Sequence, residues 1–139
     1  MKKIGLDLHD VCDAYPVLFR GLAEKWIEKG CEVHIVTGQS WELAEKTIDE
    51  LQIPYTHHFS VVDCHVERGT NVWHTDTGPW MDGTIWDSTK GLYARSVGLD
   101  IHFDDTERYA RHFPRSCSFV LVGKNFMDVY CEVLMTMLP

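Results

Sequence analysis

Short apolar segments alternate with amphipathic segments along most of the chain, and this alternation constrains the fold more than any other feature. Apolar runs with the composition of buried strands occur at residues 2–8, 32–37, 54–62, 100–103 and 118–122. Strands that alternate with helices form a parallel sheet, because each crossover helix returns the chain to the same end of the sheet. The sequence therefore predicts an α/β fold in which a parallel sheet lies between two layers of helices.

The segments between these runs carry helical periodicity and residues typical of helix ends. Helices are predicted at residues 16–29, 41–51, 87–98 and 106–113, with a last helix after Asn125. The first of them has proline in its first turn and glycine directly after its end, as helix termini prefer. No internal repeat interrupts the pattern, and a length of 139 residues fits a single domain, residues 1–139.

One segment, at about residues 63–87, lacks helical periodicity. Its sequence HTDTGPW has the residues of a hairpin turn. We expect a small β-hairpin-like insert that lies over one end of the sheet. Three tryptophans of this segment, Trp73, Trp80 and Trp86, are suited to stacking on a base or sugar, although packing against the sheet is the default role of aromatic residues in a small insert.

Net charge and cysteine usage limit the class of protein. The net charge is −8, and the acidic residues are spread along the chain. An extended nucleic-acid surface needs clustered Lys and Arg, so the charge argues weakly against nucleic acid as a partner and does not exclude it. The charge says little about a small phosphorylated substrate, because a local cation can reverse the field inside one pocket. Five scattered cysteines indicate reduced thiols, and the absence of a secretory signal or membrane-length apolar run predicts a cytoplasmic protein with no membrane contact. The sequence leaves the oligomeric state open.

Polar side chains occur where the predicted strands end. Asp7 ends the first strand, Thr37 ends the second, Asp104 and Asp105 end the fourth, and Lys90 lies at the start of the helix after the insert. These side chains should meet at the carboxyl edge of the sheet. Two carboxylates from different strands can hold Mg²⁺, and a carboxylate beside the metal can attack phosphorus. A hydroxyl and an ammonium group can stabilise the charge of the transferred phosphoryl group.

The order of these motifs resembles that of the haloacid dehalogenase (HAD) superfamily, whose members are mostly Mg²⁺-dependent phosphohydrolases. The matching segments are DLHDV at residues 7–11, IVTG at 35–38, the single Lys90 and FDD at 103–105. The likeness extends from residue 4 to about residue 122. The chain also resembles small HAD-like proteins of bacteria and their phages. It implies a three-layer, Rossmann-like, HAD-like domain that hydrolyses a phosphomonoester through an aspartyl-phosphate.

The resemblance also implies roles for the matched residues. It makes Asp7 the nucleophile, and it places Thr37, Gly38 and Lys90 on the phosphoryl oxygens of the substrate. Thr37 and Lys90 are thus expected to contribute to both binding and catalysis.

The metal ligands and the general acid are the less regular part of the match. Mg²⁺ is the implied cofactor, with Asp7 and Asp104 as first choices for its ligands and Asp105 as an outer partner or helix cap. The family has an aspartate acid/base two places after the nucleophile, where this chain has His9; the backbone carbonyl of His9 remains a metal ligand. Three interpretations stay open: His9 is the proton donor, Asp10 replaces it, or the site binds Mg²⁺ and phosphate without efficient turnover.

Other classes of protein fit the sequence less well. Receiver domains of two-component signalling use the same residue types in a different order, and no dinucleotide-binding or P-loop glycine motif is present. A zinc site is also poorly supported. The spacing of the cluster formed by His57, His58, Asp63, Cys64 and His65 matches no recognised structural zinc motif. Two alternatives to an enzyme remain, namely a non-catalytic HAD-like phosphate- or nucleotide-binding protein and a structural or interaction protein.

Overall fold

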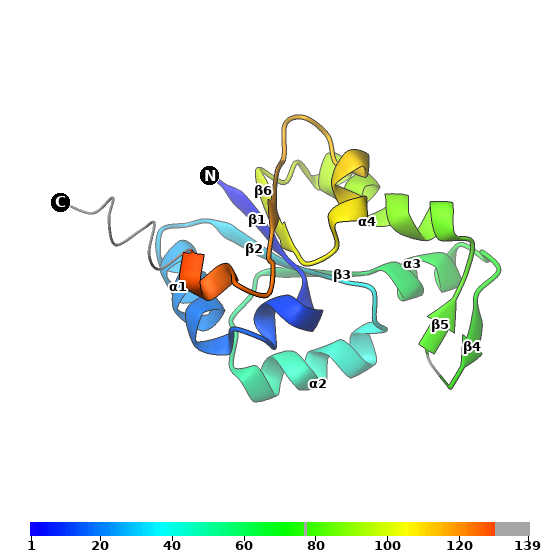
Figure 1. Ribbon diagram of the computed structural model, residues 1–139, viewed down its shortest axis with the longest axis horizontal. Helices are drawn as coiled ribbons and strands as arrows, with labels where there is room; N and C mark the ends of the chain where they lie inside the picture. Colours follow the sequence, from blue (N-terminus) through cyan, green and yellow to red (C-terminus); the bar gives the residue numbers. More distant parts are fainter. Residues whose placement is uncertain (77, 130–139) are drawn as a thin grey trace.

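The computed structural model describes residues 1–76 and 78–129. Its centre is a sheet of five parallel strands in the order β3-β2-β1-β6-β7. These strands are β1 (Lys3–Leu6), β2 (Glu32–Thr37), β3 (His57–Ser60), β6 (Ile101–Asp104) and β7 (Ser118–Leu121). Each of them overlaps an apolar run of the sequence, which confirms the predicted α/β fold with a parallel sheet (Figure 1).

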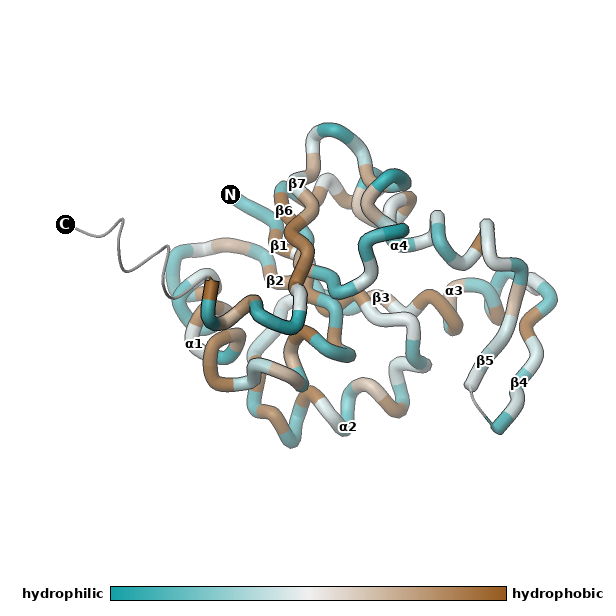
Figure 2. The backbone as a smooth tube through the Cα atoms, viewed as in Figure 1, coloured by the Kyte–Doolittle hydropathy of each residue, from teal (hydrophilic) through white to brown (hydrophobic). Residues whose placement is uncertain are grey.

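Helices cover both faces of the sheet. They are α1 (Pro16–Glu28), α2 (Trp41–Leu51), α3 (Val61–Glu67), α4 (Gly83–Val97) and the 3₁₀ helix η2 (Glu107–His112). On one face, Phe19 of α1 and Ile48 of α2 pack with Val33 and Ile35 of β2. On the other face, α4 and η2 pack around Val36. Successive strand residues point to opposite faces, so β2 supplies the core of both layers, and Figure 2 shows the apolar residues along the strands.

The strand order creates a crevice at the centre of the sheet. From β1 the chain moves outward through β2 to β3, and α4 then carries it back to β6, on the other side of β1. The direction of travel therefore reverses between β1 and β6. In open parallel sheets, ligands bind at the carboxyl ends of the strands that flank such a reversal.

The third strand is shorter than predicted, and a helix follows it. The sequence predicted a strand at residues 54–62 and an insert without helix, but β3 ends at Ser60 and α3 begins at Val61. The cause is a helix cap, because Oγ of Ser60 accepts a hydrogen bond from the backbone N–H of Asp63 at 3.1 Å. The two valines that extend the apolar run therefore form the buried start of α3.

The predicted hairpin is present, and the helix after it starts earlier than expected. Strands β4 (Trp73–Thr75) and β5 (Gly78–Trp80) pair antiparallel, and the hairpin projects from one end of the molecule (Figure 1). The prediction that α4 starts at residue 87 was wrong, because Asp82 caps the N–H groups of residues 84 and 85 and α4 begins at Gly83. Lys90 thus lies two turns inside α4, not in its first turn.

The last predicted helix is only partly covered. Residues 126–129 are helical, and the remainder of that expected helix lies outside the described residues. The segment predicted as a helix at residues 106–113 is the 3₁₀ helix η2. Among the described residues, no helix has both the length and the apolar content that a membrane span requires.

Candidate active site

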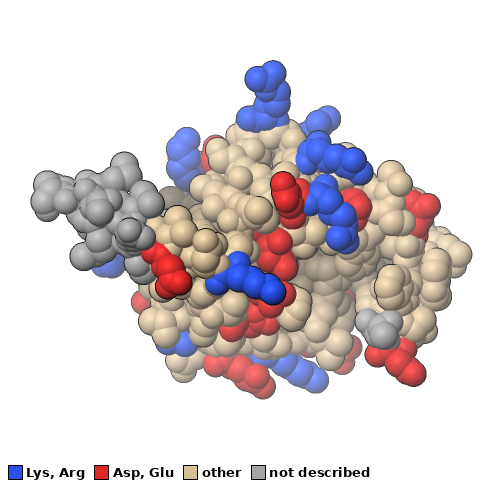
Figure 3. Space-filling model, in the orientation of Figure 1, with Lys and Arg blue, Asp and Glu red and all other residues tan. Residues whose placement is uncertain are grey.

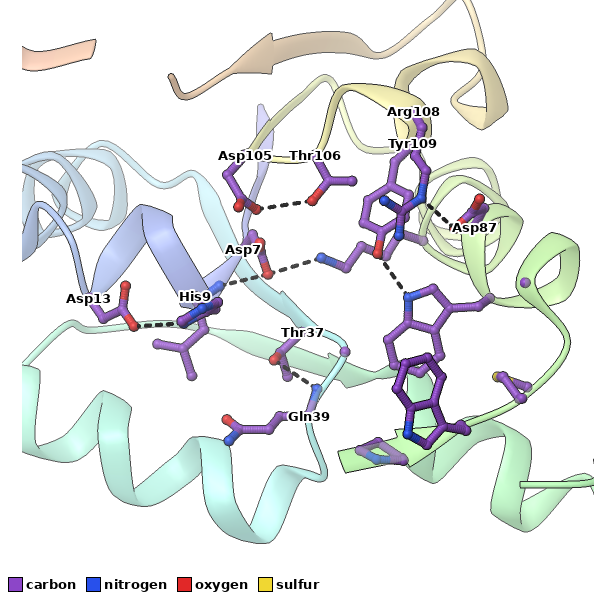
Figure 4. Close-up of a pocket in the computed structure, with 18 of the residues that line it drawn as sticks. Asp7, His9, Asp13, Thr37, Gln39, Asp87, Asp105, Thr106, Arg108 and Tyr109 are labelled. Atoms are coloured by element: carbon purple, nitrogen blue, oxygen red, sulfur yellow. Dashed lines mark hydrogen bonds and ion pairs between the residues drawn. The ribbon is translucent and has the colours of Figure 1, made fainter. Parts of the chain in front are cut away.

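Polar residues predicted from the sequence meet at one cavity at the carboxyl edge of the sheet. The cavity has a volume of about 710 Å³. Asp7 enters it from the end of β1, Thr37 from the end of β2, Asp105 from the end of β6 and Lys90 from α4. Figure 4 shows the side chains around this cavity, and Figure 3 shows acidic side chains gathered beside a hollow on the same face. The cavity therefore lies at the reversal between β1 and β6.

Lys90 lies between two carboxylates at the base of the cavity. Its Nζ is 2.9 Å from Oδ1 of Asp7 and 2.9 Å from Oδ2 of Asp104. All three side chains are buried, with exposed fractions of 4% for Lys90, 6% for Asp7 and 0% for Asp104. We refer to Asp7, Lys90 and Asp104 as the buried ion triad. It joins β1, β6 and α4, which lie far apart in the sequence.

Asp104 has a full set of partners within the protein. Besides Lys90, its Oδ2 accepts a hydrogen bond from Nε2 of His102 at 2.9 Å, and its Oδ1 accepts one from the backbone N–H of Thr106 at 3.1 Å. The imidazole of His102 fits beside β1 because residue 5 is glycine; a Cβ on Gly5 would lie 2.5 Å from Nδ1 of His102. These contacts hold Asp104 behind the cavity, where it does not line the open space.

The three charges of the buried ion triad shift one another's titration. Burial raises the pKa of Asp7 to about 7, against the opposing charge of Lys90 and with the help of Asp104. Burial also favours the neutral form of Asp104, but the hydrogen bond from His102 and the charge of Lys90 hold its pKa well below the usual range. Burial alone would lower the pKa of Lys90, yet the two carboxylates raise it. Two carboxylates share one ammonium group, so the site favours an additional cation.

The turn after Asp7 brings His9 to the mouth of the cavity. This turn, η1 (Leu8–Cys12), is kinked, because His9 is extended (φ −73°, ψ 130°) and Asp10 is left-handed (φ 58°). Oδ1 of Asp13 accepts the backbone N–H of Asp10 at 2.7 Å, and its Oδ2 lies 3.2 Å from Nδ1 of His9. Burial would lower the pKa of His9, but Asp13 and Asp10 outweigh it and raise the pKa above its usual 6.5.

The loop after β2 supplies the predicted phosphate-binding residues. Oγ1 of Thr37 accepts the backbone N–H of Gln39 at 3.2 Å, which leaves the Thr37 hydroxyl hydrogen to point elsewhere. Gly38 lies against the indole of Trp86, since a Cβ at this position would be 2.8 Å from the ring. The indole N–H of Trp86 donates to the hydroxyl of Tyr109 at 2.8 Å. The ammonium of Lys90 lies 5.3 Å from the ring centre of Tyr109.

The carboxylates around the cavity form a donor set for a hard cation. Asp7, Asp104 and Asp105 each offer an oxygen, and these oxygens lie within 4.8 Å of one another. Asp105 lines the cavity, whereas Asp104 does not. Among the described residues, two further sets of donor atoms lie equally close together, namely the exposed set of His9, Asp10 and Asp13, and the set of Glu32, His34 and His57 away from the cavity.

Several residues of the cavity were not predicted. Asp13, Arg108 and Tyr109 line it, and His102 supports it from behind. For Asp13 a signal existed, since it is the third carboxylate of the acidic segment at the start of the chain. For Arg108, Tyr109 and His102 the only signal is spatial, because they reach the site from η2 and β6. Trp86, for which the sequence left stacking and packing open, also lines the cavity.

The histidine-rich segment around β3 does not gather its own donors at one place, but His57 lies beside Glu32 and His34, and these three side chains offer ligand atoms within 4.8 Å of one another. His57 and His58 lie on opposite faces of the strand, where their rings stack on His34 and Trp41 at centroid distances of 4.4 Å and 3.9 Å. His65 is buried in α3 and hydrogen bonded to other side chains. His57, His58 and His65 therefore lie in separate places and share no common donor set.

Comparison of the chain with protein-family models, curated proteins and solved structures finds no significant match. The function must therefore be inferred from the residues of the cavity and from their order along the chain.

Proposed function

We propose that this protein is a Mg²⁺-dependent phosphomonoester hydrolase of the HAD type, with Asp7 as nucleophile. The observation that carries the proposal is the buried ion triad at the point where the strand order reverses, beside an open cavity. Nucleophile, cation and supporting carboxylate come from three elements in the chain order of that superfamily. Burying one ammonium group and two carboxylates has a large desolvation free energy, which their mutual attraction has to offset.

The donor set of the cavity fits Mg²⁺. The ion prefers carboxylate and carbonyl oxygens and keeps several waters, and the cavity is acidic and open enough to hold them. We assign Asp7 and Asp105 as the carboxylate ligands, together with the backbone carbonyl of His9. Asp104 was the first choice from the sequence, with Asp105 as an outer partner, but the contacts of Asp104 with Lys90 and His102 favour a positioning role for it. When bound, Mg²⁺ would neutralise charge on the phosphoryl oxygens.

The chain's own residues account for the transfer step. A carboxylate oxygen of Asp7 forms a bond to phosphorus as the ester P–O bond breaks, which leaves an aspartyl-phosphate and an alkoxide. Thr37 donates its hydroxyl hydrogen to a phosphoryl oxygen, and the ammonium of Lys90 stabilises the negative charge. Asp104 keeps Lys90 at this position. The same contacts serve the second step, in which water hydrolyses the aspartyl-phosphate.

His9 is the residue best placed to move the proton. Its ring is at the mouth of the cavity, and, against the effect of burial, Asp13 and Asp10 raise its pKa, which increases the imidazolium fraction relative to a free histidine. It protonates the leaving alkoxide and then accepts a proton from the attacking water. Asp10 is the weaker candidate, since it does not line the cavity.

Phosphate release is the direct test. The wild type should release phosphate from p-nitrophenyl phosphate only with Mg²⁺, and Asp7→Asn should abolish this while circular dichroism shows the fold intact. Asp87→Asn is the matched control, because Asp87 lines the same cavity but is paired with Arg108 at its rim. His9→Ala should lower the rate about 10²–10⁴-fold, and His9→Asp should restore part of it.

The alternatives give different results in the same assay. A wild type that releases no phosphate but binds Mg²⁺ and a phosphate analogue is the non-catalytic binding protein. A wild type that binds neither is a structural or interaction protein, and the proposed chemistry is then wrong.

A further inference from the structure

One wall of the cavity is aromatic and apolar, and the phosphoryl chemistry proposed above does not use it. The wall comes from β5, the residue after it, α4 and η2. It consists of Pro79, Trp80, Met81, Trp86 and Tyr109, all of which line the cavity. We refer to these five residues as the aromatic wall.

The inner part of the aromatic wall is held directly against the phosphate-binding loop. The indole of Trp86 lies against Gly38, the residue after Thr37, at a distance that admits no side chain there. Its N–H is already bonded to the hydroxyl of Tyr109 at 2.8 Å. The ring therefore offers the cavity an apolar surface next to the place proposed for the phosphoryl group.

The outer part of the aromatic wall is Trp80. Its indole N–H donates to Oγ1 of Thr75 at 2.6 Å, and yet 48% of the residue is exposed. About half of Trp80 is thus open to solvent where it lines the cavity. Exposure of the apolar indole surface to water is unfavourable in free energy, and a flat apolar ligand that covers this surface would remove it from water.

Trp73 provides a contrast within the same hairpin. It pairs with Trp80 in the register of β4 and β5, and 49% of it is exposed. It is not among the residues that line the cavity. The two indoles are therefore equally exposed but differ in their access to the cavity.

The size and polarity of the cavity point to a ligand larger than phosphate. A volume of about 710 Å³ is typical of sites for whole small molecules, about 300–1,000 Å³. The cavity is also lined by two polar side chains, Gln39 and Thr47, each of which can both donate and accept hydrogen bonds. The edge of a nucleobase presents donors and acceptors together, whereas a plain aryl ring presents neither.

We propose that the substrate of this site is a nucleoside monophosphate whose base stacks on Trp80 of the aromatic wall, with its phosphate between Asp7 and Thr37. This inference rests on the proposed phosphatase function for the reaction, but the base contact is a property of the cavity itself. Stacking tolerates any base, so discrimination between bases is expected to be modest.

The test compares two substrates that differ only in the base. The base effect is kcat/KM for adenosine 5′-monophosphate divided by kcat/KM for ribose 5-phosphate, both with Mg²⁺. Stacking of one base on one aromatic ring corresponds to a ratio of about 5–150-fold. Trp80→Ala should bring the ratio close to one, whereas Trp73→Ala should leave the wild-type ratio and both rates unchanged.

Binding to Asp7→Asn separates this inference from the reaction. With Mg²⁺ present, the variant should bind adenosine 5′-monophosphate at least about 5-fold more tightly than ribose 5-phosphate in calorimetry. Equal affinities, or a wild-type base effect near one, would overturn the nucleotide inference even if phosphate is released from both compounds. Tighter binding of adenosine 5′-monophosphate without any turnover would support the base contact and reject the hydrolase. A larger kcat/KM for a phosphotyrosine peptide than for any nucleoside monophosphate would also overturn the inference.

Discussion

Nε2 of His102 lies 2.9 Å from Oδ2 of Asp104, and neither residue has any exposed surface. Burial lowers the pKa of His102, so its imidazole is neutral and donates its one N–H to Asp104. His102 therefore orients the carboxylate that holds Lys90 at the base of the cavity. It touches neither the open space nor, in the proposed chemistry, the substrate.

Replacing His102 should weaken both the fold and the reaction. His102→Phe removes the donor to a buried carboxylate, a hydrogen bond to a charged group that contributes about 1.5–3 kcal/mol. Urea unfolding should show a loss of this size. In steady-state kinetics kcat should fall more than KM rises, because Lys90 acts on the charge of the transition state.

His34→Phe is the matched control for this prediction. His34 is also buried in the sheet and pairs with a carboxylate, Glu32 at 2.8 Å. It lies in the same row of the sheet as His102, on the other side of Gly5. Its hydrogen-bond partners Glu32 and Tyr93, however, do not line the cavity. Its replacement should lower stability and leave kcat nearly unchanged. Equal losses of kcat in the two variants would show that His102 acts only on stability.

A methyl group at position 5 should destabilise the protein. The Cβ of Gly5→Ala would lie 2.5 Å from Nδ1 of His102 and 2.8 Å from Cδ1 of Leu99, so His102 has to move. Overpacking of this kind costs roughly 1–3 kcal/mol, measurable by urea unfolding. Gly21→Ala in α1 is the control: nothing lies within 4 Å of its Cβ, and alanine in a helix should stabilise by about 0.5–1 kcal/mol. A neutral Gly5→Ala would mean that His102 is not tightly held.

Mg²⁺ should raise the thermal stability of the wild type. At a concentration about 100 times its Kd, a ligand that binds only the folded state contributes about 2.7 kcal/mol. Asp105→Asn should lose most of the increase in Tm, because Asp105 is a proposed ligand at the cavity. Asp13→Asn should keep it. The opposite pattern would place the metal in the exposed set of His9, Asp10 and Asp13.

Acid should destabilise the protein partly through His65. Oγ1 of Thr89 donates to the carbonyl of Ile85, so it must accept from Nε2 of His65 at 2.7 Å, while Nδ1 of His65 faces Thr70. Burial and then Arg68 lower the pKa of His65 below the usual 6.5, which favours the neutral ring, and the Thr70 hydroxyl can donate to Nδ1 in that form.

The free energy of unfolding depends on pH because the folded and unfolded chains bind different numbers of protons at His65. The unfolded chain takes up a proton near pH 6.5 and the folded chain does not, so stability is complete above that pH and declines as the pH falls below it. The wild type should lose more unfolding free energy between pH 8 and pH 5.5 than His65→Gln does. Identical pH profiles would contradict this assignment of His65.

The part of the site that the sequence could predict depends on sheet geometry. Asp7, Thr37 and Asp105 follow apolar strands, and parallel strands bring their carboxyl ends to one edge. Lys90 was found only through its order in the chain, since a lysine within a helix is ordinarily exposed. Its burial between two carboxylates is a tertiary contact that no local pattern contains.

The parts that were missed depend on local hydrogen bonds or on contacts between distant segments. Ser60 stops β3 with a cap, which overrides the strand preference of the valines that follow it. Asp82 starts α4 before its helical periodicity becomes clear. The contact of Trp86 with Gly38 joins residues from α4 and the loop after β2, and only the folded chain shows why residue 38 must be glycine.

The hairpin of β4 and β5 has a consequence for how this fold can change its ligand. The residues proposed to perform the chemistry belong to the sheet edge and α4, while Trp80 belongs to a projecting hairpin that contributes nothing to the buried ion triad. Exchange of that hairpin for another of similar length would alter which molecules are admitted and leave the reacting groups in place. On the proposed function, the outer part of the aromatic wall can therefore vary without a change in the reacting groups, whereas Trp86 shares α4 with Lys90 and ties the inner part of the wall to them.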